Sequence, residues 1–111
     1  HVPQVEPAEL WEDLRGEEPA MVIDVREPRE YEHAHIPGAR LIPLPELLND
    51  SQIPRARPVV LVCRGGRRST RAAALLRQRG YDNVRVLHQG LQAWERENLL
   101  EAVDYGRSDE K

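Results

Sequence analysis

Two short apolar runs constrain the fold of this chain more than any other feature of its sequence. Residues 20–25 read AMVIDV and residues 57–63 read RPVVLVC, and both runs are rich in β-branched side chains. A strand with one face in water alternates apolar and polar residues, whereas runs without alternation are typical of strands buried on both faces. We therefore expect both to be strands of a parallel sheet, with a third strand at 83–87.

Segments with helical patterns separate these strands. The expected helices lie at 5–14, 27–35, 69–80 and 90–99. A turn is expected where proline and glycine adjoin at 36–39, and an extended piece followed by a short helix at 41–50. Strands that alternate with helices predict an α/β domain of three layers, in which a mostly parallel central sheet is flanked by helices on both faces. At 111 residues the chain fits a single domain over 1–111, with a core over about 5–104 and a polar tail at 105–111.

Charge is distributed unevenly along the chain. The net charge is −3, yet residues 51–81 contain eight arginines and no acidic residue. We interpret this window as a local anion site within an acidic protein. The window lacks the interleaved aromatic side chains that favour nucleic-acid binding, so no nucleic-acid partner is expected. No apolar run approaches the roughly 20 residues of a membrane-spanning helix, so no membrane partner is expected either.

A single cysteine, Cys63, limits the redox and metal chemistry of the chain. One cysteine forms no internal disulfide and no zinc site with several sulfur ligands, and a free thiol fits a reducing, cytoplasmic compartment. His33 and His35 have no clear third ligand, so a structural hydrogen bond is the better interpretation of His35. We expect neither a metal nor a cofactor.

Cys63 ends an expected strand, and a short loop joins it to the helix at 69–80. In parallel sheets, ligands bind beyond the carboxyl ends of the strands. Glycines allow a loop to curl its N–H groups around an anion, and the helix start adds further N–H groups. The residues expected to favour a thiolate at Cys63 and to bind an oxyanion are Arg64, Gly65, Gly66, Arg67 and Arg68. A buried structural cysteine is the alternative, but it does not explain two glycines and three arginines in succession.

Three segments of the chain, in this order, resemble the signatures of the rhodanese family of sulfurtransferases. Residues 22–39, VIDVREPREYEHAHIPGA, resemble the first signature, and residues 59–69, VVLVCRGGRRS, resemble the active-site loop. Residues 86–94, VLHQGLQAW, resemble the closing segment. The chain departs from the family pattern at Ala34 and Gln89, where glycine is common, and both positions lie outside the loop.

This resemblance implies a reaction. Cys63 matches the nucleophile that takes a sulfane sulfur from a donor and becomes a persulfide. Thiosulfate is the implied donor, because Cys63, Arg64, Gly66 and Arg68 fill the Cys-Arg-x-Gly-x-Arg pattern of thiosulfate-using members. The implied donor-binding residues are Arg64, Gly65, Gly66, Arg67, Arg68 and Ser69. Since the chain has no second cysteine, the sulfur must pass to an external acceptor: cyanide, a small thiol or a sulfur-relay protein.

Residues around the loop receive supporting roles. Asp24 matches a family residue that helps hold the loop, and its carboxylate is expected to accept hydrogen bonds from loop N–H groups or an arginine. Arg26 is expected to face either the pocket or a surface acid. Glu30 is expected to pack or to cap its helix locally. Ser69 is expected chiefly as the N-cap of the helix at 69–80, with donation of its hydroxyl to the sulfur as the alternative.

Two other functions fit part of the pattern. Cysteine phosphatases and arsenate reductases have a similar loop, but phosphatases need Cys-x5-Arg. Here the sixth residue after Cys63 is Ser69, and arginine comes one position earlier at Arg68. A rhodanese-like module that regulates or binds a partner without catalysis is the second alternative. Such modules often lack the cysteine, so a cysteine beside an arginine-rich loop favours an enzyme.

Overall fold

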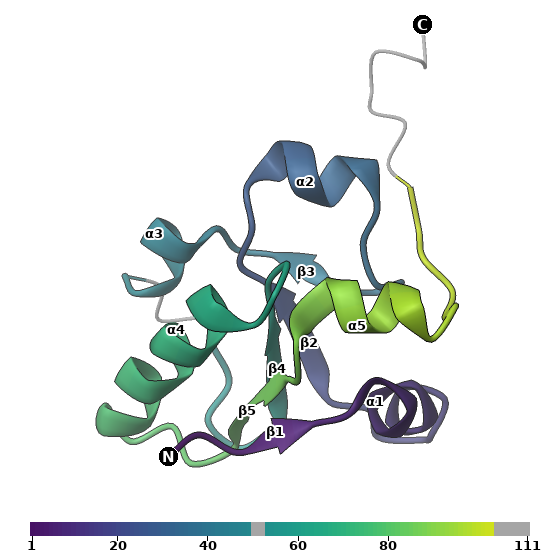
Figure 1. The fold of residues 1–111 in the computed structure, drawn as a ribbon. Coiled ribbons are helices and arrows are strands. Elements are labelled where there is room, and N and C mark those ends of the chain that lie inside the picture. The colour runs from purple at the N-terminus through teal and green to yellow at the C-terminus, as the bar shows by residue number, and fades with distance from the viewer. Residues whose placement is uncertain (50–52, 104–111) are drawn as a thin grey trace, which may run out of the picture.

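A five-stranded sheet lies at the centre of the computed structural model, which describes residues 1–49 and 53–103 (Figure 1). Its strands are β1 (Gln4–Val5), β2 (Met21–Asp24), β3 (Arg40–Leu41), β4 (Val59–Val62) and β5 (Val84–Leu87). The order across the sheet is β1-β5-β4-β2-β3, and all neighbouring strands are parallel. The carboxyl ends of the strands therefore meet at one edge of the sheet, where Cys63 directly follows β4.

Helices cover both faces of this sheet (Figure 1). They are α1 (Pro7–Leu14), α2 (Pro28–His33), α3 (Leu44–Leu47), α4 (Arg67–Gln78) and α5 (Gly90–Arg96). Buried side chains of α3 and α4 pack on one face, and those of α1 and α5 pack on the other. The expected three-layer α/β architecture is confirmed. The short helix α2 follows β2 and lies above the carboxyl edge of the sheet in Figure 1.

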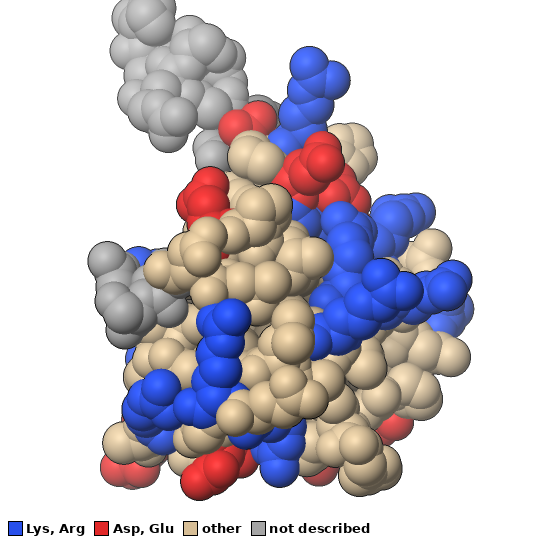
Figure 2. Space-filling model, turned by 90° about the vertical axis from the view of Figure 1, so that its left-hand side faces the viewer, with Lys and Arg blue, Asp and Glu red and all other residues tan. Residues whose placement is uncertain are grey.

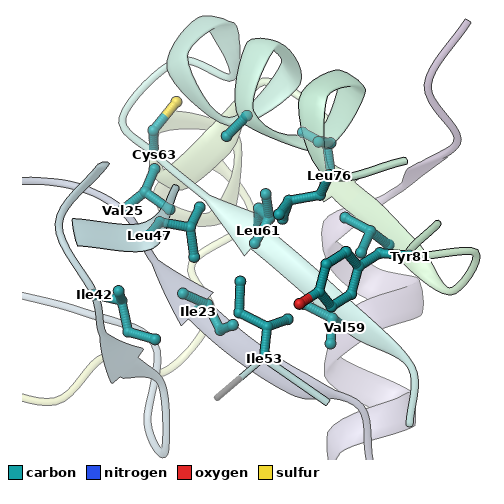
Figure 3. Close-up of a cluster of buried hydrophobic side chains, with 14 residues drawn as sticks. Ile23, Val25, Ile42, Leu47, Ile53, Val59, Leu61, Cys63, Leu76 and Tyr81 are labelled. Carbon is teal, nitrogen blue, oxygen red and sulfur yellow. The ribbon is translucent and has the colours of Figure 1, made fainter. Parts of the chain in front are cut away.

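The central strand β4 is buried on both faces, as its lack of alternation predicts. Val59 and Leu61 belong to the cluster beneath α4, which Figure 3 shows, whereas Val60 and Val62 belong to the cluster with Trp94 of α5. All five side chains are at most 1% exposed. Burying one such valine contributes on the order of 1.5–3 kcal/mol, so the strand that carries Cys63 is firmly held.

Several predicted element boundaries differ from the structure, and those of the first and last helices have clear causes. Val5 lies in β1, paired with Leu87 of β5, rather than in the first helix, which begins at Pro7. A strand of two residues is too short to produce a periodic pattern. The last helix ends at Arg96 rather than at 99, because Asn98 adopts a left-handed φ of 57°.

Some predictions fall outside the described residues. These are the polar tail at 105–111 and position 50 at the end of the segment 41–50. Among the helices that the structure does describe, none is long and apolar enough to cross a bilayer.

Candidate active site

The Cys63 sulfur lies within a cradle of hydrogen-bond donors at the carboxyl edge of the sheet. The backbone N–H of Gly66 donates to Sγ at 3.1 Å and that of Ser69 at 3.4 Å. The Ser69 hydroxyl lies 3.3 Å from Sγ. Cys63 is only 1% exposed, and Figure 3 shows its sulfur at the edge of the apolar cluster, turned toward the helix rather than toward Leu61 or Ile23.

Gly66 shapes this cradle because its φ of 102° lies in the left-handed region, which other residues rarely adopt. Gly66 is the N-cap of α4, so the helix begins at Arg67, two residues earlier than predicted. The prediction that Ser69 is chiefly the N-cap is therefore wrong. Ser69 is the third helical residue, and its N–H is one of the donors that a helix start leaves without an intrahelical acceptor.

The Ser69 hydroxyl has two acceptors for one proton. It lies 3.1 Å from the carbonyl oxygen of Gly66 as well as 3.3 Å from the Cys63 sulfur. When the sulfur is a thiol, the S–H can donate to the hydroxyl, which then donates to the carbonyl. When the sulfur is a thiolate, the hydroxyl proton is free to turn toward it. The arrangement therefore accommodates both protonation states of Cys63.

The start of α5 holds the loop from its other side. The N–H groups of Leu91 and Gln92 donate to the carbonyl oxygens of Cys63 and Arg64 at 2.8 and 3.0 Å. This contact requires Gly90, which has a φ of 62° and approaches so closely that an added Cβ would lie 2.6 Å from the Arg64 carbonyl oxygen. The sequence analysis did not predict this contact; it only matched residues 86–94 to the family's closing segment.

Arg68 is the one arginine of the predicted loop that pairs with an acid in the described residues. Its two terminal nitrogens donate to the Glu30 carboxylate at 3.2 and 3.4 Å. Burial opposes ionisation of Glu30, but the Arg68 hydrogen bond, the Glu27 N–H and the charges of Arg68 and Arg26 outweigh it, and the pKa of Glu30 is lowered. The hydrogen bond to Glu30 raises the pKa of Arg68.

Glu30 therefore does more than its predicted local role. It does cap α2, since the Glu27 N–H donates to its Oε1 at 3.0 Å. Its partner Arg68 lies 38 positions away, and no spacing rule connects the two. By contrast, Arg64, Gly65 and Arg67 are exposed at the mouth of the loop.

Asp24 and Arg26 form a buried ion pair at the carboxyl end of β2. Arg26 is 3% and Asp24 1% exposed, and the Arg26 guanidinium donates to both carboxylate oxygens at 2.9–3.1 Å. Arg26 also donates to the Ala34 carbonyl oxygen at 2.7 Å. Of the two kinds of donor expected for Asp24, the described residues supply the arginine: Arg26 donates through its guanidinium and also through its own backbone N–H, at 3.0 Å. Arg26 therefore pairs with a buried acid rather than with an acid of the surface.

The arginine-rich window does not form a single site. Four of its members lie away from Cys63 and donate to backbone carbonyl oxygens; these are Arg55, Arg57, Arg77 and Arg79. Figure 2 shows the basic side chains of this face as separate groups rather than as one continuous patch. The window therefore overstates the anion site, because half of its arginines serve the chain's own carbonyl groups.

The histidines have structural partners. His35 Nδ1 lies 2.7 Å from the Tyr31 carbonyl oxygen, and the two rings stack with centroids 3.7 Å apart, which confirms the expected structural hydrogen bond. His88 Nδ1 lies 2.8 Å from Oε2 of Glu6. The described residues contain no group of three His, Cys, Asp or Glu side chains placed to hold a metal ion.

The sequence and the fold of this chain are similar to those of known proteins. The family model of the rhodanese-like domain matches residues 6–97. A rhodanese-related protein from Thermoplasma volcanium has the same fold, with a TM-score of 0.83, 28% identity, and coverage of 92% of this chain and 99% of its own.

Two sulfurtransferases are similar in sequence. A sulfurtransferase of Allochromatium vinosum is 36% identical over 99 residues, which cover 88% of this chain and 92% of that protein. The thiosulfate sulfurtransferase GlpE of Pseudoalteromonas translucida is 30% identical over 90 residues, covering 75% of this chain and 80% of that protein. Several other relatives are longer, and the matched region spans 26% to 64% of their length. With a cysteine cradle at the carboxyl edge of a parallel sheet and a family match over most of its length, the chain belongs to the rhodanese-like domain family and is related to sulfurtransferases.

Proposed function

We propose that this protein transfers a sulfane sulfur from thiosulfate to cyanide or a thiol through a persulfide on Cys63. The observation that carries the proposal is the convergence of the Gly66 N–H, the Ser69 N–H and the Ser69 hydroxyl on one sulfur atom at the end of β4. Donors arranged in this way stabilise an anionic sulfur before and after it gains a second sulfur. The family match over 6–97 supports one domain as the unit that carries the activity.

The reaction has two steps. The Cys63 thiolate attacks the outer sulfur of thiosulfate, the S–S bond of thiosulfate breaks, and sulfite leaves with the electron pair. An acceptor nucleophile then attacks the outer sulfur of the persulfide, the new S–S bond breaks, and the Cys63 thiolate is restored. Because Cys63 is almost fully buried, the site suits a donor that presents a single projecting sulfur atom.

We assign donor binding to the loop residues, and support of the loop to the ion pair at the carboxyl end of β2. The donor-binding residues are Arg64, Gly65, Gly66, Arg67, Arg68 and Ser69. Arg68 has five N–H donors and uses two of them on Glu30, so others remain for the departing sulfite. Asp24 and Arg26 hold the end of β2 beside the loop. The lone reduced thiol suits a cytoplasmic, reducing compartment.

A thiosulfate:cyanide assay on the wild type and on Cys63→Ser tests the proposal. We expect thiocyanate production by the wild type and none above background by the variant. Mass spectrometry after thiosulfate treatment should show one additional sulfur atom on Cys63. A wild type that gains no sulfur and produces no thiocyanate would be a binding module instead, and hydrolysis of phosphate monoesters without sulfur transfer would favour a phosphatase.

A further inference from the structure

A groove runs along the outer wall of the cysteine loop. Its cavity of about 380 Å³ is bounded by Gly65, Gly66, Arg67 and Arg71 on one side and by Val86 and Gln89 on the other. Gly66 separates this groove from the sulfur: its N–H donates to Cys63 Sγ, while an added Cβ would meet the Gln89 backbone at 3.3 Å on the groove side. The groove therefore lies one residue away from the reacting atom, but it is distinct from the cradle.

Two arginines on this groove have no counter-ion among residues 1–49 and 53–103. Arg67 and Arg71 are exposed, and neither makes a hydrogen bond or ion pair within the described residues, whereas Arg68 is paired with Glu30. They are four positions apart on α4, so their side chains lie on the same face of the helix. His88 also lines the groove, and its Nδ1 lies 2.8 Å from Oε2 of Glu6, so this carboxylate already has a partner.

Helix electrostatics make this placement unfavourable for the isolated chain. A helix start is the positive end of the helix dipole and favours acidic residues, yet the first turn of α4 has none. Like charges four positions apart also destabilise a helix. Arg67 and Arg71 therefore place positive charge that no described acid neutralises on a chain of net charge −3, and this charge favours an anionic ligand on the groove.

We propose that this groove docks an acidic, extended polypeptide segment of the protein that accepts sulfur from Cys63. This inference rests on the proposed function, because a chain with one cysteine must pass its persulfide sulfur to an external acceptor. The groove is larger than thiosulfate or cyanide requires. The exposed backbone of Gly65 and the side-chain NH2 of Gln89, whose Oε1 accepts a hydrogen bond from Arg96, offer partners for a peptide main chain. Gly66 borders the groove and also donates to the Cys63 sulfur, so a segment that lies along the groove reaches the wall of the sulfur cradle.

Acceptor kinetics test this docking site. Enzyme preloaded with persulfide is mixed with cyanide, with a peptide of four glutamates followed by Gly-Cys, or with the matched peptide of four glutamines. We expect kcat/KM for the acidic peptide to exceed that for the neutral peptide by about tenfold at low salt, and the preference to shrink as salt screens the charges. Arg71→Gln should raise KM for the acidic peptide about two- to fivefold, the range of an exposed ion pair, and leave cyanide transfer unchanged.

Arg85→Gln is the matched control. It removes the same charge from β5, where Arg85 borders a different hollow beside Asp82, and it should leave all three acceptors unchanged. Equal use of the two peptides by the wild type, or equal losses in both variants, would overturn the docking site while cyanide transfer still supported the proposed function. Failure of transfer to every acceptor would overturn the proposed function itself. Anisotropy of a labelled, cysteine-free acidic peptide then shows whether the groove binds it at all.

Discussion

Ser69 and Thr70 are neighbours that both bond to the Gly66 carbonyl oxygen, but only Ser69 also reaches the Cys63 sulfur. Substitutions at these two positions can therefore distinguish a hydroxyl that stabilises only the loop from one that also stabilises the sulfur. Since the Gly66 carbonyl oxygen keeps the Thr70 N–H at 3.0 Å and the Thr70 hydroxyl at 2.6 Å, loss of the Ser69 hydroxyl leaves the loop held.

We therefore predict that Ser69→Ala slows persulfide formation while the protein stays folded. A hydrogen bond to a charged group contributes about 1.5–3 kcal/mol, so the rate should fall roughly tenfold or more. Stopped-flow measurement of sulfite release gives the rate. Thr70→Val is the control and should remain within about twofold of the wild type; similar losses in the two variants would mean that the hydroxyl acts only on the loop.

Arg68 is the loop arginine that is both partly buried and held in one orientation by an acid. Removing one donor to a developing charge costs about 2.7–4 kcal/mol, so Arg68→Ala should lower kcat/KM for thiosulfate by about 10²–10³. Glu30→Gln keeps the Arg68 charge and removes the anion that orients it, so its loss should be smaller. Saturation kinetics in thiosulfate at fixed cyanide measure both variants. An Arg68→Ala enzyme with unchanged kinetics would exclude Arg68 as a donor-binding residue.

At the scale of elements, the start of α5 and the cysteine loop form one unit through Gly90. Gly90→Ala places a methyl group against the backbone of Cys63 and Arg64, whereas Gly38→Ala at a φ of 83° meets nothing within 4 Å. Both substitutions force a left-handed alanine, which costs about 1–2 kcal/mol. We expect Gly90→Ala to cost about 1–3 kcal/mol more than Gly38→Ala, as in overpacked cores, and to reduce sulfur transfer.

Urea unfolding of the two glycine variants measures this difference. If the two variants had equal urea midpoints, α5 would be able to move away from the added methyl group without loss of stability. The close approach of Gly90 would then not hold the cysteine loop in place. Because both variants have the same left-handed strain, the comparison isolates the contact between α5 and the loop.

The elements also show what local sequence patterns predict and what they do not. β4 and its cysteine were predictable, because a run buried on both faces has its own composition. The start of α4 was not, because serine is a frequent N-cap but the left-handed Gly66 decides where the helix begins. The pairs Arg68–Glu30 and Leu91–Cys63 join residues far apart in the chain, and such contacts leave no local signal. For the same reason, the window of eight arginines looked like one site although the fold divides it.

At the scale of the whole molecule, the segment after α5 ties the end of the described chain to the region of α2. Ala102 and His35 exchange two backbone hydrogen bonds of 2.8 and 2.9 Å, and Trp94 Nε1 donates to the Leu100 carbonyl oxygen at 3.0 Å. Glu101 lies within this segment, and its Oε2 is buried without a hydrogen-bond partner in the described residues. Burial, with the hydrogen bond and charge of Glu95, raises the pKa of Glu101 to about 7, although Arg26 opposes the shift.

This raised pKa predicts the sign of a pH effect on folding. Between about pH 4.5 and pH 7 the folded chain keeps the Glu101 proton while the unfolded chain releases it, so the free energy of unfolding falls as pH rises. Glu30 has the opposite effect on the pH dependence of stability, because its pKa is lowered in the folded chain. Its contribution to the free energy of unfolding is present above pH 4.5 and is lost in more acidic solution. The two groups therefore act in different pH ranges and can be measured separately.

We predict that Glu101→Gln, which resembles the protonated acid, stabilises the protein above pH 7 and reduces the loss of stability between pH 5 and pH 8. Urea midpoints at these two pH values provide the measurement. Glu97→Gln is the control, since Glu97 is exposed at the end of α5 and its substitution should retain the wild-type pH dependence. If Glu101→Gln lost as much stability as the wild type over this range, the buried carboxyl group would not be the cause, and the His35–Ala102 connection would be insensitive to its charge.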